Sequence, residues 1–242
     1  MTVNFNRPQT TVVLAMSVDG KITDATRSPA RFGSRNDKAH LEKQIALADA
    51  TLFGADTLRT YGTTLRVSSP ELLQLRERQE KPSQPVQIVC SRSRQFDPNL
   101  RFFQQPVPRW LLTTEPDENE TLGDSSPLLL FERILVVKKQ EHEIDWLDAF
   151  QQLASFGWQR LAILGGGKLV ASLFAADLID EIWLTVCPLI LGGIDAPTPV
   201  EGKGFLAELA PRLELLAVER IEQELLLHYR LQRGLHSQPE SI

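Results

Sequence analysis

Short apolar runs alternate with segments of helical periodicity over the first three quarters of the chain. A short apolar run between turn residues is typical of a buried strand, whereas apolar residues three and four positions apart indicate one face of a helix. Strands are predicted over Thr11–Met16, Ala50–Gly54, Val86–Cys90, Trp110–Thr113, Arg133–Val137 and Leu161–Leu164. Helices are predicted over Asp37–Ala48, Asp56–Tyr61, Pro70–Lys81, Asp145–Phe156 and Lys168–Ala176. The alternation predicts an α/β fold with a mostly parallel central sheet flanked by helices.

The last quarter of the chain follows a different pattern. Leu178–Leu191 is apolar on both faces, so we expect a long strand at the centre of the sheet. A long loop is predicted over Gly192–Pro211, and Leu213–Ile221 with Glu224–Leu231 predicts a closing antiparallel hairpin. Polar segments predict two further loops and a mobile tail: Lys21–Gly33, Glu115–Ser126 and Arg233–Ile242. No Pro-, Gly- or Ser-rich linker divides the chain, so we predict a single domain over residues 1–242.

For three of the helices, the sequence also predicts a capping residue, a surface position or an apolar face. Ser34 is a candidate N-cap for the first helix, because its hydroxyl can accept from the free N–H groups of the first turn. Pro70–Lys81 is charged and is expected on the surface. Asp145–Phe156 is amphipathic and is expected to end at Gly157. Its predicted apolar face consists of Trp146, Leu147, Phe150 and Leu153.

Composition narrows the function classes. The chain has 242 residues, of which 42% are hydrophobic and 24% charged, as in a globular protein, and its net charge of −5 does not suggest a nucleic-acid partner. Cys90 and Cys187 lie in apolar runs and are expected to be buried free thiols, which fits a reducing cytoplasm. None of the four histidines is near a cysteine in sequence, so no metal site is predicted. The N-terminal segment has no signal-peptide pattern and no apolar run is long enough to cross a membrane.

Three consecutive glycines, Gly165, Gly166 and Gly167, stand between a predicted strand and a predicted helix. Such a turn favours an anion, because the helix N-terminus carries partial positive charge and glycine lets a phosphate approach the backbone. Lys168 adds a formal positive charge. The spacing matches neither established nucleotide-binding fingerprint, and glycines also occur where a turn simply needs positive φ. The pattern alone leaves both interpretations open.

Three segments together carry a family resemblance: LAMSVDGKIT, DATLFGADTLRT and ILGGGKLVASLFAADLIDEIWLTVCPLILGG. In this order and spacing they resemble the C-terminal reductase domain of the RibD proteins of riboflavin biosynthesis, over residues 11–231. The resemblance implies a dihydrofolate-reductase-like fold, a homodimer and NADPH as cofactor. It also implies reduction of the ribosyl chain of a phosphorylated ribosylaminopyrimidine to ribityl. The zinc-site signature of the deaminase domain is missing from the sequence, so a stand-alone reductase is expected.

The resemblance also assigns residues to the cofactor. The glycine loop with Lys168 and Leu169 would hold the pyrophosphate, and Asp19 would form the catalytic turn over the active site. The remaining residues implied to contact the cofactor are Ala15, Met16, Thr57, Ser91 and Arg92. Two interpretations of Ser91 and Arg92 stay open: they bind a 2′-phosphate, which would select NADPH, or they belong to a solvated polar loop.

The substrate half departs from the family pattern. Ile45, Tyr61, Ser68 and Leu164 stand where the family usually has an arginine, an aspartate, an arginine and a glutamate. The residues expected at the substrate are Ser34, Tyr61, Leu65 and Arg66. Arg35, Arg59 and Arg66 are alternative contacts for a substrate phosphate, and no spacing rule selects one of them. Two alternatives to a pyrimidine reductase therefore remain: a reductase of another small substrate, and a nucleotide-binding module without activity.

Overall fold

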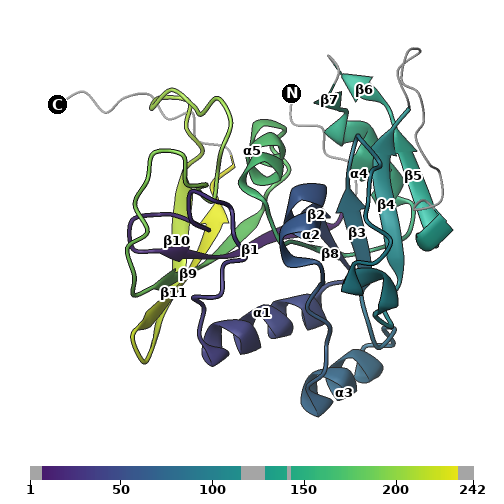
Figure 1. Ribbon diagram of the computed structural model, residues 1–242, viewed down its shortest axis with the longest axis horizontal. Helices are drawn as coiled ribbons and strands as arrows, with labels where there is room; N and C mark the ends of the chain where they lie inside the picture. Colours follow the sequence, from purple (N-terminus) through teal and green to yellow (C-terminus); the bar gives the residue numbers. More distant parts are fainter. Residues whose placement is uncertain (1–6, 116–128, 141–142, 234–242) are drawn as a thin grey trace.

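Nine strands form one twisted sheet in the part of the chain that the structure describes (Figure 1). The computed structural model describes residues 7–115, 129–140 and 143–233. The strand order is β10-β11-β9-β1-β8-β2-β3-β4-β5. Their bounds are β1 Gln9–Ser17, β2 Ala50–Gly54, β3 Val86–Cys90, β4 Arg109–Thr114, β5 Arg133–Val137, β8 Arg160–Ile163, β9 Glu181–Cys187, β10 Leu213–Ile221 and β11 Glu224–Leu231. Neighbours from β9 to β5 pair in parallel, whereas β11 pairs antiparallel with β9 and β10. The predicted mostly parallel sheet with a closing hairpin is confirmed.

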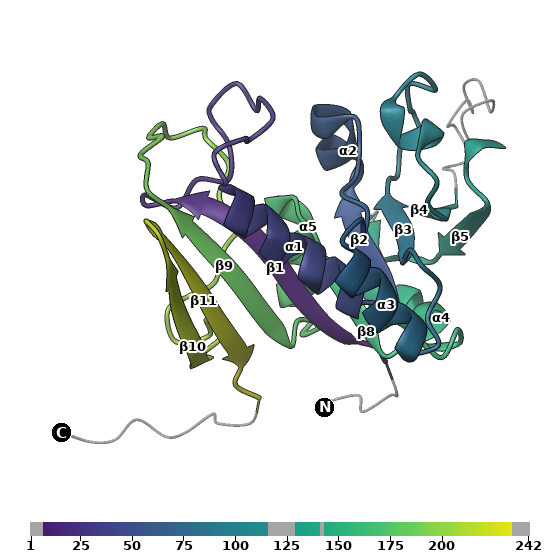
Figure 2. The same cartoon turned by 90° about the horizontal axis from the view of Figure 1, so that it is seen from below.

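Helices cover both faces of the sheet. Helices α1 and α3 lie on one face and α4 and α5 on the other, while α2 follows directly from the carboxyl end of β2 (Figures 1 and 2). The bounds are α1 Arg35–Leu47, α2 Ala55–Tyr61, α3 Pro70–Arg78, α4 Trp146–Ala154 and α5 Gly167–Ala175. A 3₁₀ turn, η1 (Arg101–Gln104), and a small antiparallel pair, β6 (Lys139–Gln140) with β7 (Glu143–Ile144), were not predicted.

Side-chain caps set the helix starts. The Ser34 hydroxyl accepts from the N–H groups of Asn36 and Asp37, so the predicted N-cap of α1 is confirmed. Asp145 caps α4 in the same way. The chain after α4 turns at Gly157, whose φ of 71° is in the left-handed region that favours glycine.

The main core lies between the sheet and helices α4 and α5. Trp146, Phe150 and Leu153 of α4 are buried there, each side chain contributing roughly 1.5–3 kcal/mol. Leu147 is 41% exposed, so its assignment to the apolar face was wrong. Leu147 follows Trp146 directly, so its side chain points about 100° away around the helix, off the buried face. Ala149 belongs to the buried face instead.

One predicted strand needs correction. Leu178–Leu191 forms a strand only over β9, which is the third strand from one edge. Leu178 and Ile179 are buried in the core, but they precede the strand, so their apolar character reflects burial and not sheet pairing. The polar segments Glu115–Ser126 and Arg233–Ile242 lie almost entirely outside the described residues.

Helix α3 is the surface helix that its charges predicted, except at one residue. Arg76 is fully buried. Its guanidinium donates to the carbonyl oxygens of Ala46 at 2.8 Å and Ala48 at 2.7 Å, at the end of α1, and its Nε donates to Pro82. A cation at a helix C-terminus satisfies carbonyl groups that lack a partner within the helix.

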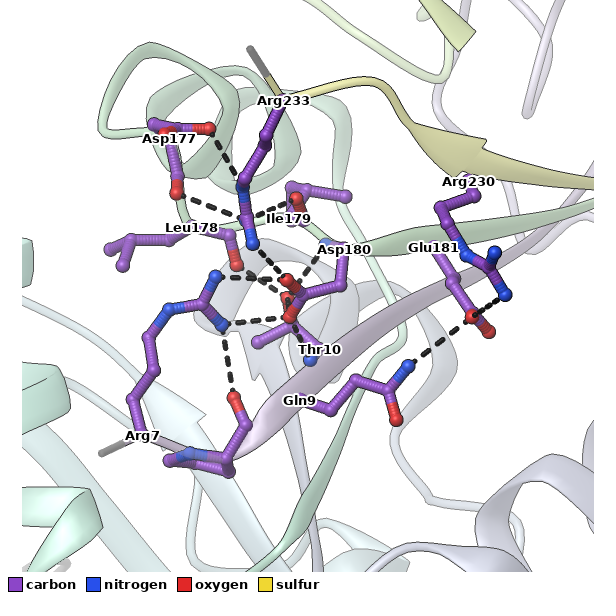
Figure 3. A network of polar contacts seen from close by, with 11 residues as sticks. Arg7, Gln9, Thr10, Asp177, Leu178, Ile179, Asp180, Glu181, Arg230 and Arg233 are labelled. Atoms are coloured by element: carbon purple, nitrogen blue, oxygen red, sulfur yellow. Dashed lines mark hydrogen bonds and ion pairs between the residues drawn. The ribbon is translucent and has the colours of Figure 1, made fainter. Parts of the chain in front are cut away.

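The Asp180 carboxylate, just before β9, binds residues near both ends of the described part of the chain. Asp180 accepts from the Arg7 guanidinium at 2.7 and 2.9 Å and from the Thr10 N–H at 2.7 Å, and it pairs with Arg233 beyond β11 (Figure 3). Burial alone would raise the pKa of Asp180, but the Arg7 and Thr10 donors and the Arg233 charge hold it below its ordinary value. Three strands are thereby fixed relative to one another at one end of the sheet.

We expect Asp180→Asn to lower the free energy of unfolding by about 2 kcal/mol or more, because the neutral amide leaves the partly buried Arg7 guanidinium without a counter-charge and leaves Arg233 only its pair with the exposed Asp177. Urea unfolding at pH 7 measures the loss. The lowered pKa means that Asp180 stabilises the fold above its ordinary pKa and loses this effect as the pH falls, so the difference between the proteins shrinks in acid.

Asp177→Asn is the matched control, because Asp177 is exposed and its carboxylate pairs with Arg233 at 3.3 Å. Its expected cost is below about 1 kcal/mol. Equal losses in the two variants would contradict a special role for Asp180.

Candidate functional site

A cleft of about 990 Å³ opens at the carboxyl ends of β2 and β3. Its walls come from α2, the start of α5, the segment after β3, the β6–β7 pair and the loop after β1. Ligands of open parallel sheets bind at this edge, because loops and helix N-termini converge there. The cleft is therefore the candidate ligand site.

The glycine loop forms one wall of this cleft. Gly165 has a φ of 95°, which favours glycine, and its carbonyl accepts from the Gly54 N–H at 2.9 Å. Gly166 is the N-cap of α5 and supplies no side-chain cap. A Cβ atom at Gly166 would lie 3.5 Å from the Thr57 hydroxyl oxygen, which is ordinary van der Waals contact. The first turn of α5 thus faces the cleft without a capping side chain, as an anion site requires.

The segment after β9 packs against the same loop. A Cβ atom at Gly167 would lie 2.3 Å from the carbonyl oxygen of Thr198, so no other residue fits there without a shift. The Glu201 N–H donates to the Gly167 carbonyl at 3.1 Å, and the Glu201 carboxylate pairs with Arg27 at 3.6 Å. Gly167 therefore serves packing, whereas Gly166 leaves space at the cleft.

Asp19 holds two loops together. Its carboxylate accepts from the Ser17 hydroxyl at 2.6 Å and from the N–H groups of Leu191 at 3.1 Å and Gly192 at 2.7 Å. The Ser17 hydroxyl, followed by the Leu191 N–H, lowers the pKa of Asp19 to about 2. Asp19 is thus ionised at neutral pH and fixes the turn after β1, and it is not a lining residue of the cleft. Its part in the chemistry stays a prediction.

The other end of the cleft is rich in polar groups. Ser91 is buried and its hydroxyl oxygen accepts from the Arg94 N–H at 3.2 Å. Arg92 pairs with Glu143 at 3.0 Å. Arg59 pairs with Asp56 and donates to the Ser93 hydroxyl oxygen at 3.2 Å. Arg59 and Glu143 were not predicted at the cofactor, because their positions near Ser91 depend on contacts between distant segments.

Tyr61 stands at the remaining wall. Its hydroxyl donates to the Ala30 carbonyl oxygen at 3.4 Å, and burial raises the pKa of its phenol. Arg27 and Ser28 also line the cleft, on a loop that the sequence marked only as polar. The expected substrate residues Ser34, Leu65 and Arg66 do not line it. Leu65 packs beside α1 and Arg66 is exposed, whereas Ser34 caps α1 and contacts Glu224.

The cleft thus brings together eight of the predicted site residues: Thr57, Tyr61, Ser91, Arg92, Gly166, Gly167, Lys168 and Leu169. Gly165 is not among the lining residues, and Ala15 and Met16 lie half-buried at the end of β1. Within the described ranges, no three His, Cys, Asp or Glu side chains are grouped to hold a metal ion. None of the described helices is long and apolar enough to cross a membrane.

The sequence was compared with known families. Residues 8–227 match the model of the RibD C-terminal domain. The chain belongs to the RibD C-terminal domain family. The resemblance drawn from the three segments is confirmed.

Relatives of the RibD C-terminal domain support this placement. The chain is 31% identical over 234 residues to the 2,5-diamino-6-ribosylamino-4(3H)-pyrimidinone 5′-phosphate reductase of Archaeoglobus fulgidus, covering 94% of this chain and 100% of the relative. It is 27% identical to the enzyme of the same name from Methanothermobacter thermautotrophicus, covering 92% and 98%. A pyrimidine reductase-like protein of Corynebacterium diphtheriae has the same fold, with a TM-score of 0.79, 20% identity and coverage of 95% and 94%.

We expect Asp19→Asn to loosen the turn after β1 in this RibD-type domain. The amide is a weaker acceptor than a carboxylate, so the Leu191 and Gly192 amides should exchange faster with deuterium and the melting temperature should fall at pH 7. Because the folded-state pKa of Asp19 is lowered from 3.8 to about 2, its stabilisation is present above pH 4 and lost as the pH falls towards 2.

The melting temperatures of wild type and variant should therefore converge in that acid range. Asp195→Asn, an exposed change in the same loop, is the control. Unchanged exchange at Leu191 and Gly192 would contradict the role of Asp19 in holding the loops.

Proposed function

We propose that the chain is an NADPH-dependent reductase of riboflavin biosynthesis. It would reduce the ribosyl group of a phosphorylated aminopyrimidine to ribityl; the name of the Archaeoglobus relative gives a ribosylaminopyrimidinone phosphate as the compound which that protein reduces. The match over the full length of that relative carries the proposal. The glycine-lined cleft supports it, because a nicotinamide cofactor supplies the hydride and needs a cradle for its phosphates.

The residues present fit such a cofactor. Gly166 leaves space beside an α5 N-terminus without a side-chain cap, and Lys168 is exposed at the cleft. The pyrophosphate would bind there. Ala15 and Met16, at the end of the adjacent strand β1, would then flank the nicotinamide. Thr57 lies within 3.5 Å of the position of a Gly166 Cβ and completes the cradle.

The preference for NADPH rests on the polar end of the cleft. Arg59 and Arg92 line it together with Ser91 and Ser93. Guanidinium and hydroxyl donors of this kind bind a 2′-phosphate through charge-assisted hydrogen bonds. Glu143 pairs with Arg92 at 3.0 Å, so the phosphate would compete with this carboxylate for the guanidinium.

The test is oxidation of NADPH with the diaminopyrimidine ribosyl phosphate as substrate and with dihydrofolate as the comparison. Turnover of the pyrimidine alone supports the proposal. Turnover of dihydrofolate alone would favour a reductase of another substrate. Binding of NADPH without turnover of either would favour a nucleotide-binding module.

Gly166→Val should weaken NADPH binding at least tenfold, because the added side chain occupies the space at the cradle. Isothermal titration measures the affinity and thermal unfolding checks the fold. The backbone φ of −80° at Gly166 accommodates valine, so the folded state should persist.

Gly167→Ala is the contrasting variant. Its Cβ would clash with the Thr198 carbonyl, so it should lose stability. Unchanged NADPH affinity in folded Gly166→Val protein would remove the glycine loop from the cofactor site.

We also propose that the chain is a homodimer through the face of the hairpin that points away from α1. Pairing between β10 and β11 places a largely apolar set on this one face, in which Arg220 is the charged member: Leu213, Leu215, Val218, Arg220, Leu225, Leu227 and Tyr229. Leu215 is 52% and Val218 53% exposed. An apolar surface of this kind is typical of an interface between subunits.

We also propose that the protein is cytoplasmic. The free thiols Cys90 and Cys187 agree with this location.

Leu215→Glu should convert the dimer to monomer, because two charges would be buried in the interface. Sedimentation velocity at micromolar concentration measures the change. Val136→Glu on β5, at the far edge of the sheet, is the control and should leave the dimer intact. A monomeric wild type would contradict the proposal.

A further inference from the structure

The loop after β1 and the loop after β9 meet beside the first turn of α5. The Ile22 N–H donates to the Pro197 carbonyl oxygen at 2.9 Å, which joins the two loops. The Glu201 N–H donates to the Gly167 carbonyl oxygen at 3.1 Å, which joins the second loop to α5. All four residues line the cleft. The two loops are therefore held together at the wall where the cofactor phosphates are proposed to bind.

The Glu201 carboxylate lies against the start of α5. A Cβ atom built on Gly167, the first residue of α5, would lie 3.0 Å from the Glu201 carboxylate oxygen Oε2. The Glu201 side chain is 19% exposed, so water screens its charge less than at the open surface. A helix N-terminus attracts anions, and here a carboxylate of the protein already stands beside it. A phosphate bound at the same helix end is therefore repelled by Glu201.

Arg27 supplies the opposite charge. Its guanidinium lies 3.6 Å from the other Glu201 carboxylate oxygen, Oε1. The Arg27 side chain is 52% exposed and lines the same cleft as Glu201. Opposite charges at this distance largely cancel at points farther away, so an anion that approaches α5 meets a pair with little net charge.

The backbone around Arg27 is fixed by local hydrogen bonds. Arg27 has a φ of 58°, in the left-handed region that residues other than glycine seldom adopt. Its N–H donates to the Asp24 carbonyl oxygen at 3.0 Å. The Asp24 carboxylate accepts from the N–H groups of Thr26 at 2.9 Å and Ser28 at 3.1 Å, on either side of Arg27. An unfavourable φ that the surrounding contacts enforce is typical of functional sites.

We infer that Arg27 and Glu201 set the affinity of the cleft for the cofactor: Glu201 weakens binding of the pyrophosphate at α5, and Arg27 cancels the Glu201 charge. The inference rests on the proposed function. A reductase must exchange its nicotinamide cofactor after each hydride transfer. The carboxylate beside the phosphate site speeds release of the oxidised cofactor, whereas the arginine keeps binding tight enough to fill the site. Both residues act on binding and release, and not on the hydride transfer itself.

Neutral variants of the two residues should change the NADPH affinity in opposite directions. Arg27→Gln should raise the Kd about tenfold, because Glu201 then repels the pyrophosphate without a counter-charge. Glu201→Gln should lower the Kd about threefold and slow the release of NADP+ by a similar factor. In the Glu201→Gln background, Arg27→Gln should raise the Kd less than about threefold, because no carboxylate remains to be cancelled. Isothermal titration measures the Kd, and stopped-flow fluorescence measures the release.

Matched controls change the same charges away from the cleft. Arg31→Gln and Glu208→Gln alter exposed residues of the same two loops, and neither residue lines the cleft. Each should leave the Kd within about twofold of wild type. At an ionic strength of about 1 M, salt screens the repulsion, so the ratio of the Kd values of Arg27→Gln and wild type should shrink.

An ion pair that only clamps the two loops together gives a different result. Both single variants would then bind NADPH more weakly, so an unchanged or higher Kd in folded Glu201→Gln would overturn the inference. An equal effect of Arg27→Gln with and without Glu201 would also overturn it. Thermal unfolding checks each variant, and if Arg27→Gln does not fold, the direction of the change in Glu201→Gln decides.

Inorganic pyrophosphate is the second probe, and it separates this inference from the proposed function. Wild-type protein that binds pyrophosphate but not NADPH contradicts the proposed function, and the same variants then judge the inference by their affinity for pyrophosphate. Wild-type protein that binds neither compound contradicts both.

Discussion

The Asp180 carboxylate fixes three strands at one end of the sheet, and the site at the other end depends on this. It binds Arg7 before β1, Thr10 within β1 and Arg233 after β11, and it directly precedes β9. Strands β1 and β9 start at this end and β11 finishes there. Their opposite ends, with Ser17, Cys187 and Glu224, must therefore meet at the edge where the cleft opens. Residues far apart in sequence become neighbours because one charge fixes the strands that carry them.

The two halves of the cleft are built by different means. The half proposed for the cofactor uses backbone groups and the small size of Gly166, supported by α5, and a backbone site of this kind tolerates changes in nearby side chains. The half proposed for the substrate uses side chains from the loop after β1 and from α2. Their positions depend on tertiary contacts such as that between the Tyr61 hydroxyl and the Ala30 carbonyl oxygen. This agrees with a chain that keeps the glycine loop expected from the resemblance while Tyr61 and Leu164 depart from the expected substrate pattern.

Local patterns predicted the elements well because strand and helix periodicity are properties of neighbouring residues. The hairpin and the N-cap at Ser34 were found this way. The exceptions are residues whose environment is set by segments distant in sequence. Arg76 is a charged residue in a charged helix, yet it is fully buried because the end of α1 presents carbonyl groups to it. Leu178 and Ile179 are apolar because they enter the core, although they lie outside the strand.

The sequence by itself determined the alternation of strands and helices, the closing hairpin, the glycine loop and the family. Each of these is encoded in contiguous residues whose spacing has a direct physical meaning. Only the tertiary structure decided which side chains surround the cleft. It placed Arg59 beside Ser93, tied Asp19 into the turn after β1, and paired Arg27 with Glu201. The burial and charge that govern these groups come from segments distant in sequence, and no local pattern records which segments will meet.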